Sequence, residues 1–149
     1  MRILLVEDNP GDAELFLKCG QDLNASIRWV ESAEAALSYL RHESPFEREP
    51  TPALVVTDLG LNRATGIQLI TQMRADPQLK NIRIAVLTGT ARGDEMKACE
   101  RLGVTQYFRK PLNLADWKRT VRQVIMLAEK NASAAQSERA RASVKGNEH

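Results

Sequence analysis

Four short strand-like runs of the sequence each end at side chains that can do chemistry. These side chains are Glu7 and Asp8 after the run 3–6, Asp58 after the run 53–56, Thr88 after the run 84–87, and Lys110 after the run 106–108. Three carboxylates placed together repel one another and need a cation. Oxygen ligands with room for water suit Mg²⁺, which binds through a few carboxylates and phosphate oxygens. Brought to one place, the acidic residues therefore predict a magnesium site.

A lysine opposite such a site makes sense if an incoming phosphoryl group brings further negative charge. The combination favours phosphoryl transfer to a carboxylate, with Asp58 as the nucleophile that forms an aspartyl phosphate. Mg²⁺, Lys110 and the Thr88 hydroxyl are then expected to hold the three phosphoryl oxygens, because positioning and electrostatics do most of the catalysis in such transfers. The backbone amides of Gly89 and Thr90 are expected to add donors.

The spacing of hydrophobic residues predicts the elements that must position these side chains. The runs 3–6, 53–56 and 84–87 are continuous, apolar and rich in branched residues, as in central parallel strands that are buried on both faces. The runs 27–30 and 106–108 are more polar and are typical of edge strands. Helical periodicity lies between and after these strands, in the segments 15–23, 35–40, 66–75, 96–102 and 114–128. Asn113 is the expected N-cap of the last helix and Gly103 the expected C-cap of the fourth.

Five strands alternating with five helices predict a single α/β domain with a doubly wound five-stranded parallel sheet and helices on both faces. In such sheets, sites form at the carboxyl ends of the strands, which is where the chemical residues stand. Taken singly, each of these residues has an ordinary explanation as a solvated strand end, a turn residue or a surface lysine. Their joint placement at four strand ends favours a functional site.

The composition limits the alternatives. The chain has 149 residues, which is long enough to bury one sizeable core without disulfides or metals as staples. Its 21 basic and 19 acidic side chains give a net charge of +2, so neither a nucleic acid nor a membrane surface is expected as a partner held by electrostatics. The longest apolar run, 124–128, is far shorter than the roughly 20 residues of a membrane-spanning helix.

The ends of the sequence carry two further expectations. The apolar run 3–6 is interrupted at once by acidic residues and is too short for a secretory signal, so we expect a cytoplasmic protein with Cys19 and Cys99 as free thiols. Residues 1–130 are expected to form the domain. Residues 131–149, rich in Ala, Ser, Glu, Lys and Arg, are expected to be a polar tail, either a helical extension or disordered.

These motifs resemble the receiver domain of two-component response regulators. The matching pieces are 6–9 (Val-Glu-Asp-Asn), 56–58 (Val-Thr-Asp), 87–89 (Leu-Thr-Gly) and 107–111 (Tyr-Phe-Arg-Lys-Pro), in the order and spacing of that family. The stretch Glu-Asp-Asn-Pro-Gly-Asp at 7–12, with the proline-bearing loop before residue 53, looks most like the small stand-alone regulators paired with bacterial phytochromes. The resemblance implies a CheY-like sheet with strand order 2-1-3-4-5.

The resemblance also implies a role for individual residues. Asp58 would be the phosphoacceptor, and Mg²⁺ would be held by Asp8, Asp58 and the Gly60 carbonyl, with Glu7 binding through water. Thr88 and Tyr107 would form a switch, in which the inward movement of the threonine hydroxyl lets the tyrosine turn toward the core.

The expected function is that of a single-domain response regulator that accepts a phosphoryl group from a sensor histidine kinase. It would catalyse its own phosphorylation and slow hydrolysis without being a metabolic enzyme. The surface of the last two helices and the strand at 106–108 would signal to a downstream protein target or a phosphotransfer protein. Kinase recognition is expected at 12–18 and 111–113, and apolar residues at 125–127 serve either a homodimer or extra core.

Two other functions stay open at this point. A phosphatase of the haloacid-dehalogenase class also uses a strand-end aspartate, but it normally needs a second aspartate two residues later, where Gly60 stands. A binding module that works without phosphorylation would leave the acidic site vestigial. Full retention of the acidic residues, Thr88 and Lys110 speaks against that alternative.

Overall fold

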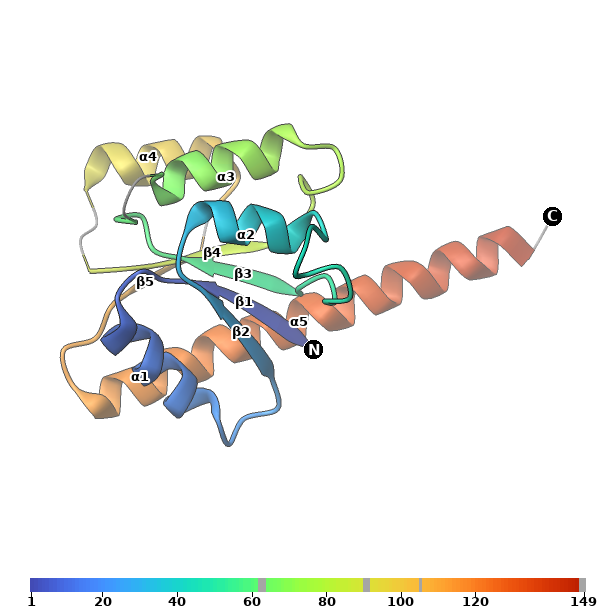
Figure 1. Ribbon diagram of the computed structural model, residues 1–149. Coiled ribbons are helices and arrows are strands. Elements are labelled where there is room, and N and C mark those ends of the chain that lie inside the picture. Colours follow the sequence, from blue (N-terminus) through green and yellow to red (C-terminus); the bar gives the residue numbers. More distant parts are fainter. Residues whose placement is uncertain (62–63, 90–91, 105, 148–149) are drawn as a thin grey trace.

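The computed structural model describes residues 1–61, 64–89, 92–104 and 106–147, and it has the predicted α/β architecture (Figure 1). Strands and helices alternate along these residues. The strands are β1 (Arg2–Val6), β2 (Ser26–Val30), β3 (Leu54–Thr57), β4 (Ile84–Thr88) and β5 (Gln106–Arg109). The helices are α1 (Pro10–Gly20), α2 (Ala33–Leu40), α3 (Gly66–Ala75), α4 (Gly93–Arg101) and α5 (Leu114–Asn147).

The sheet is parallel throughout and has the order β2-β1-β3-β4-β5, which confirms the predicted topology. The three central strands are buried along almost their whole length, whereas β2 and β5 are partly exposed, as expected for edge strands. Val6 is level with Val30 on one side and with Thr57 on the other. The carboxyl ends of β1, β2 and β3 therefore meet at one edge of the sheet.

Helices cover both faces of the sheet (Figure 1). Helices α1 and α5 pack together on one face, and α2, α3 and α4 cover the other. Successive side chains of β1 alternate between the two layers. Ile3 and Leu5 pack in the core under α1 and α5 with Phe16, whereas Leu4 and Val6 belong to the core under α2 to α4.

Local signals set the ends of three helices, and those at Asn113 and Gly103 were predicted from the sequence. The Asn113 side chain accepts a hydrogen bond from the Asp116 N–H at 2.9 Å and so caps α5. Gly103, which follows α4, has a φ of +77°, the left-handed conformation that suits a glycine after a helix. At α1, Asn9 is the N-cap and Pro10 is the first helical residue, where a missing N–H is not needed.

Helix α5 is longer than the apolar stripe 114–128 predicts and continues through Asn147 (Figure 1). The segment after residue 128 is rich in Ala, Glu, Lys and Arg, which favour helix without needing a buried face. Of the apolar residues at 125–127, Ile125 lies in the core, Leu127 is half-buried and Met126 is 61% exposed. The homodimer and the domain boundary at residue 130 both stay predictions.

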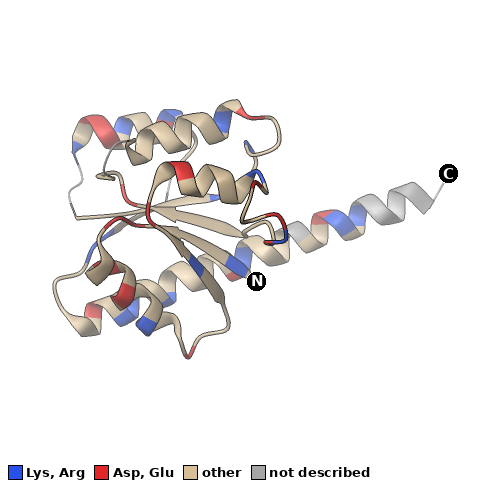
Figure 2. Cartoon of the chain, in the orientation of Figure 1, with Lys and Arg blue, Asp and Glu red and all other residues tan. Residues whose placement is uncertain are grey.

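The remaining sequence expectations concern charge, cysteines and membranes. Basic and acidic segments are interspersed over the helices in Figure 2, in line with the small net charge. Cys19 and Cys99 are free, as predicted. None of the described helices combines the length and the apolar character that crossing a bilayer requires.

Candidate functional site

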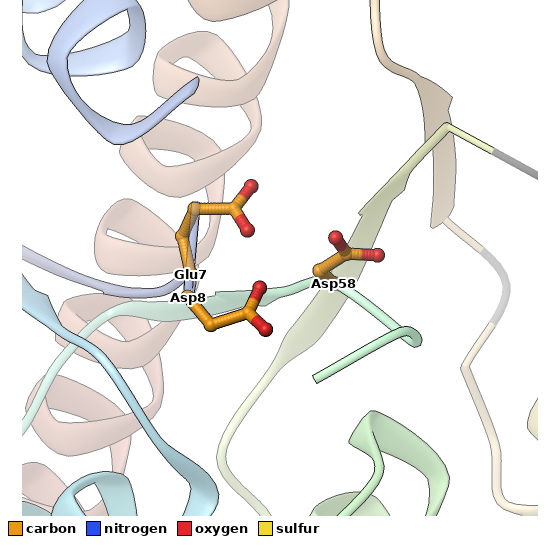
Figure 3. A group of neighbouring side chains, drawn as sticks. All are labelled: Glu7, Asp8 and Asp58. Atoms are coloured by element: carbon orange, nitrogen blue, oxygen red, sulfur yellow. The ribbon is translucent and has the colours of Figure 1, made fainter. Parts of the chain in front are cut away.

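The carboxyl ends of β1 and β3 bring three acidic side chains together (Figure 3). Glu7 and Asp8 follow β1, and Asp58 follows β3, its hydrogen-bonded neighbour. One carboxylate oxygen from each residue lies within 4.8 Å of the other two. Glu7 is only 2% exposed and Asp58 only 9%. Oxygen-only ligands at the surface edge of a sheet, close enough to repel one another, fit a hard divalent cation.

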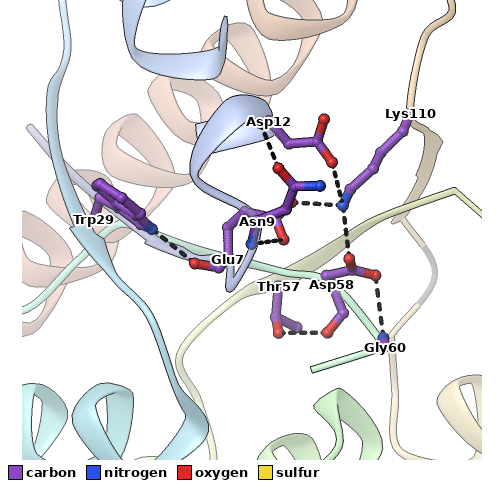
Figure 4. A network of polar contacts seen from close by, with 8 residues as sticks. All are labelled: Glu7, Asn9, Asp12, Trp29, Thr57, Asp58, Gly60 and Lys110. Atoms are coloured by element: carbon purple, nitrogen blue, oxygen red, sulfur yellow. Dashed lines mark hydrogen bonds and ion pairs between the residues drawn. The ribbon is translucent and has the colours of Figure 1, made fainter. Parts of the chain in front are cut away.

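Lys110 lies among these carboxylates, because β5 ends at the same edge of the sheet (Figure 4). Its backbone N–H donates to the Thr88 carbonyl oxygen at 2.8 Å, which ties the residue to the end of β4. Its Nζ atom lies 2.6 Å from Glu7 Oε1, 2.7 Å from Asp58 Oδ2 and 2.8 Å from Asp12 Oδ2. The predicted juxtaposition of lysine and carboxylates is therefore present.

The site perturbs the protonation of its members. Burial raises the pKa of Glu7 above its ordinary value of 4.5, while Lys110 acts in the opposite direction and the charge of Asp58 raises it further. Burial by itself would lower the pKa of Lys110, but hydrogen bonds to Asp12, Asp58 and Glu7 raise it well above its ordinary value of 10.5. Lys110 thus places a positive charge beside Glu7 that opposes the effect of burial on the pKa of Glu7.

Backbone contacts fix the position of Asp58. Its Oδ1 atom accepts a hydrogen bond from the Gly60 N–H at 3.2 Å, and its carbonyl oxygen accepts one from the Thr57 hydroxyl at 2.9 Å. Gly66, the first residue of α3, lies directly against this segment. The approach is so close that a Cβ atom at position 66 would collide with the Asp58 carbonyl oxygen and lie 2.8 Å from Leu59 Cα.

Gly66→Ala is expected to destabilise the fold by about 2 kcal/mol. The added Cβ atom would clash with backbone atoms, which cannot move aside as the end of a flexible side chain can. Chemical denaturation measures the effect. Gly93→Ala is the matched control, since Gly93 also begins a helix but nothing lies within 4 Å of its added Cβ atom. Equal stabilities of the two variants would contradict this account of the α3 contact.

Two contacts of the site were not predicted from the sequence. Asp12 stands in the first turn of α1, where an aspartate has an ordinary explanation as a residue that favours helix N-termini. Trp29, a half-buried residue of the edge strand β2, donates its indole N–H to the Glu7 carbonyl oxygen at 2.8 Å (Figure 4). A tryptophan indole is therefore attached directly to the acidic segment.

Comparison with known proteins identifies the family. The response regulator receiver domain is the family whose model matches, and it does so over residues 3–122. The chain belongs to this family. The match confirms the resemblance inferred from the strand-end motifs and assigns the protein to two-component signalling.

Individual relatives support this assignment over most of their length. The receiver domain is 34% identical to the probable methanogenesis regulatory protein FilR2 of Methanothrix harundinacea, over 82% of this chain and 79% of that protein. It is 30% identical to the response regulator Rcp1 of Synechocystis sp., over 76% of this chain and 79% of that protein. The chain is thus homologous to response regulators of similar size.

Two solved structures extend the likeness to phytochrome regulators. The phosphorylated cyanobacterial phytochrome response regulator RcpA superposes with a TM-score of 0.77 at 28% identity, covering 83% of this chain and 89% of that one. The Mn²⁺-bound form of Rcp1 gives a TM-score of 0.75 at 29% identity, covering 83% and 90%. A metal-bound neighbour agrees with the donor set of the acidic cluster, which can bind a divalent metal.

The predicted switch residues of the receiver domain lie on neighbouring strands. Thr88 ends β4 and is 3% exposed, and Tyr107 lies on β5 opposite Val86. The Tyr107 hydroxyl donates to the Met96 carbonyl oxygen of α4 at 3.4 Å. Among the described residues, a Cβ atom at Gly89 would meet the Lys110 side chain, at 4.0 Å. Thr90 lies outside the described residues, and the assigned roles of these residues stay predictions.

Proposed function

We propose that Asp58 of this receiver domain accepts a phosphoryl group from a phosphohistidine of a sensor histidine kinase. The observation that carries the proposal is the Asp58 carboxylate, nearly buried at the sheet edge, with Lys110 Nζ 2.7 Å from one of its oxygens. An Asp58 oxygen attacks phosphorus, the P–O bond forms as the P–N bond to histidine breaks, and the imidazole leaves with a proton.

The surrounding residues stabilise the charge that moves in this step. Lys110 donates to a phosphoryl oxygen in place of the Asp58 oxygen that it now contacts, and the Thr88 hydroxyl and the Gly89 N–H donate to the others. Asp8, Asp58 and the Gly60 carbonyl would hold Mg²⁺, with Glu7 contributing through water. The ion supplies positive charge that offsets the repulsion between the carboxylates and the phosphoryl group.

Hydrolysis reverses the modification. A water attacks phosphorus, the bond to Asp58 breaks, and inorganic phosphate and the free carboxylate are released. The domain thus catalyses its own phosphorylation and dephosphorylation and is a signalling protein rather than a metabolic enzyme. Because the donor phosphohistidine is formed from ATP, we place the reaction in the cytoplasm.

Phosphorylation is proposed to shift a population between two packed states. The Thr88 hydroxyl moves toward the phosphoryl group, and Tyr107 turns into the space that it leaves. This movement breaks the contact of Tyr107 with the Met96 carbonyl of α4 and so changes the surface formed by α4, β5 and α5. A downstream protein or a phosphotransfer protein binds that surface.

A phytochrome-type sensor is the proposed kinase class, supported by the likeness to RcpA. The proposed docking surface combines residues 12–18 of α1 with the loop 111–113. Leu112 in that loop is fully exposed, so its side chain is available to a docking partner.

Leu112→Asp is expected to slow phosphotransfer from phosphorylated phytochrome-type kinases by about tenfold, because truncating an exposed apolar anchor weakens docking by that order. Phosphorylation by acetyl phosphate needs no docking and serves as the control, so its rate stays unchanged. A variant that takes phosphoryl from these kinases at the wild-type rate would remove the loop from the docking surface.

Phosphorylation by a small donor tests the proposal, and two further assays test the alternatives. The purified protein is incubated with acetyl phosphate and Mg²⁺, and the product is then treated with hydroxylamine, which cleaves acyl phosphates but not phosphate esters of serine or threonine. We expect a phosphoryl adduct that hydroxylamine removes. Continuous turnover of phosphate esters would favour the phosphatase, and binding to targets unaffected by Asp58→Asn would favour the binding module.

A further inference from the structure

A fourth carboxylate contacts the acidic site from outside the cation cluster. Asp12 Oδ2 lies 2.8 Å from Lys110 Nζ, on a side chain that is 26% exposed (Figure 4). Asp12 comes from α1, whereas the cluster of Glu7, Asp8 and Asp58 comes from the ends of β1 and β3. It touches the site through Lys110 alone among the contacts of the described residues.

The backbone of Asp12 is held firmly relative to the cluster. Its N–H donates to Asn9 Oδ1 at 3.2 Å, and the next N–H, of Ala13, donates to the Asn9 carbonyl at 3.0 Å. The Asn9 N–H in turn donates to Glu7 Oε2 at 3.3 Å. The cap of α1 therefore fixes Asp12 to the segment that carries the acidic cluster. Lys110, by contrast, reaches the site on a flexible four-carbon stem.

Asp12 differs from the other two carboxylates that contact the Lys110 ammonium group. The ammonium group has three N–H donors, and three carboxylates occupy them: Glu7, Asp12 and Asp58. Glu7 and Asp58 belong to the cluster that suits a divalent cation, so their oxygens are shared with that cation or with phosphorus during the reaction. The ion pair between Asp12 and Lys110 therefore persists both when the cation binds and when the phosphoryl group is transferred.

We propose that Asp12 is a positioning residue that keeps Lys110 directed at Asp58 while the other two carboxylates are engaged by the cation and the phosphoryl group. The inference rests on the proposed function, since it concerns the same phosphoryl transfer. With Asp12 in place, the N–H donor that leaves the Asp58 oxygen faces the incoming phosphoryl oxygen without a rearrangement of the lysine stem. Without it, the stem gains conformations in which the positive charge lies away from the developing charge.

The rate of phosphorylation by acetyl phosphate tests the role in a graded series. Asp12→Ala is expected to slow the reaction by about tenfold, because a mispositioned charge gives up part of its stabilisation of the transition state. Asp12→Asn keeps the shape and one acceptor oxygen and slows it less, whereas Asp12→Glu keeps the charge and restores most of the wild-type rate. Asp22→Asn, at an exposed position that follows α1, is the control for charge alone and leaves the rate unchanged.

Two further measurements exclude a general structural effect. In a Lys110→Met background, Asp12→Ala is expected to add no further slowing, because its effect passes through the lysine. The Mg²⁺ affinity of Asp12→Ala is expected to change by less than about threefold, since Asp12 lies outside the cation cluster. An Asp12→Ala rate equal to or above that of the wild type, or equal slowing in both backgrounds, would overturn the positioning role. Wild-type protein that takes no phosphoryl group would instead overturn the proposed function.

Discussion

Lys110→Met is expected to reduce the free energy of unfolding by about 3 kcal/mol at neutral pH. The Lys110 side chain is largely buried, and removing it leaves the buried carboxylates of Glu7 and Asp58 without their cation. Breaking a buried pair by removing one partner is strongly destabilising, because the remaining charge is buried and uncompensated. Methionine keeps the apolar stem, so the loss reports the charge. Denaturant unfolding measures it, with Lys118→Met on an exposed turn of α5 as the control.

The stability loss of Lys110→Met is expected to depend on pH in a definite direction. Burial already raises the pKa of Glu7, and Lys110 opposes the rise, so the variant raises this pKa further. A carboxyl group whose pKa is higher in the folded state than in the unfolded state favours folding below its unfolded pKa, and this contribution is lost as pH rises through the folded pKa. The deficit of Lys110→Met should therefore be largest at neutral pH and shrink on acidification, as Glu7 becomes protonated in both proteins. A deficit that grows on acidification would contradict this account.

The same variant should lose about two orders of magnitude in the rate of phosphorylation by acetyl phosphate, the usual scale for removing one preorganised donor. Mg²⁺ should restore part of its stability, since a cation among the carboxylates replaces the lost charge. Stabilisation by Mg²⁺ is thus expected to be larger for Lys110→Met than for the wild type. An equal response of both proteins would show that the lysine and the ion do not share these carboxylates.

Asp8→Asn is expected to weaken Mg²⁺ binding by at least about tenfold, because it removes one of the few charged oxygens that a small divalent cation needs. Trp29 supplies the measurement, since its indole N–H contacts the Glu7 carbonyl and its fluorescence should change as Mg²⁺ binds. Asp22→Asn, an exposed acidic residue far from the strand ends in sequence, removes the same charge and should leave the affinity unchanged.

Two outcomes would count against this prediction. Trp29→Phe should abolish the fluorescence response although the buried Trp117 remains, and a persisting response would assign the signal to another part of the chain. Equal Mg²⁺ affinities of Asp8→Asn and the wild type would remove Asp8 from the ligand set. Chelation of Mg²⁺ should also stop phosphorylation of the wild-type protein.

The fold was predictable because its central strands are buried on both faces. Runs such as 3–6 and 84–87 must be apolar at every position to fit between two layers of helices, and this leaves a signal that needs no other information. The length of α5 was not predictable from periodicity, since the sequence of its last turns carries no apolar stripe. Only intrinsic helix preference marks that segment, and this preference is a weak signal.

The acidic site was predictable for a topological reason. In a parallel sheet every strand ends at the same edge, so Asp58 and Lys110, which are 52 positions apart, are brought together by strand order alone. The contact between Asp12 and Lys110 depends instead on how α1 is set over that edge. Likewise, Trp29 reaches the Glu7 carbonyl through the register of β2 against β1. Such contacts arise from tertiary packing, and neither could be predicted from the residue types or from their spacing in the sequence.

The most direct test of the account is the intact mass of the protein after incubation with acetyl phosphate. Wild-type protein and Asp58→Asn are compared, each with Mg²⁺ and with the ion chelated. We predict one phosphoryl group on the wild-type chain in the presence of Mg²⁺, and none on the variant or after chelation. Phosphoryl addition to Asp58→Asn at the wild-type rate would contradict the assignment of the phosphoacceptor. Absence of the adduct from wild-type protein, with acetyl phosphate and with phosphorylated kinases alike, would contradict the central claim.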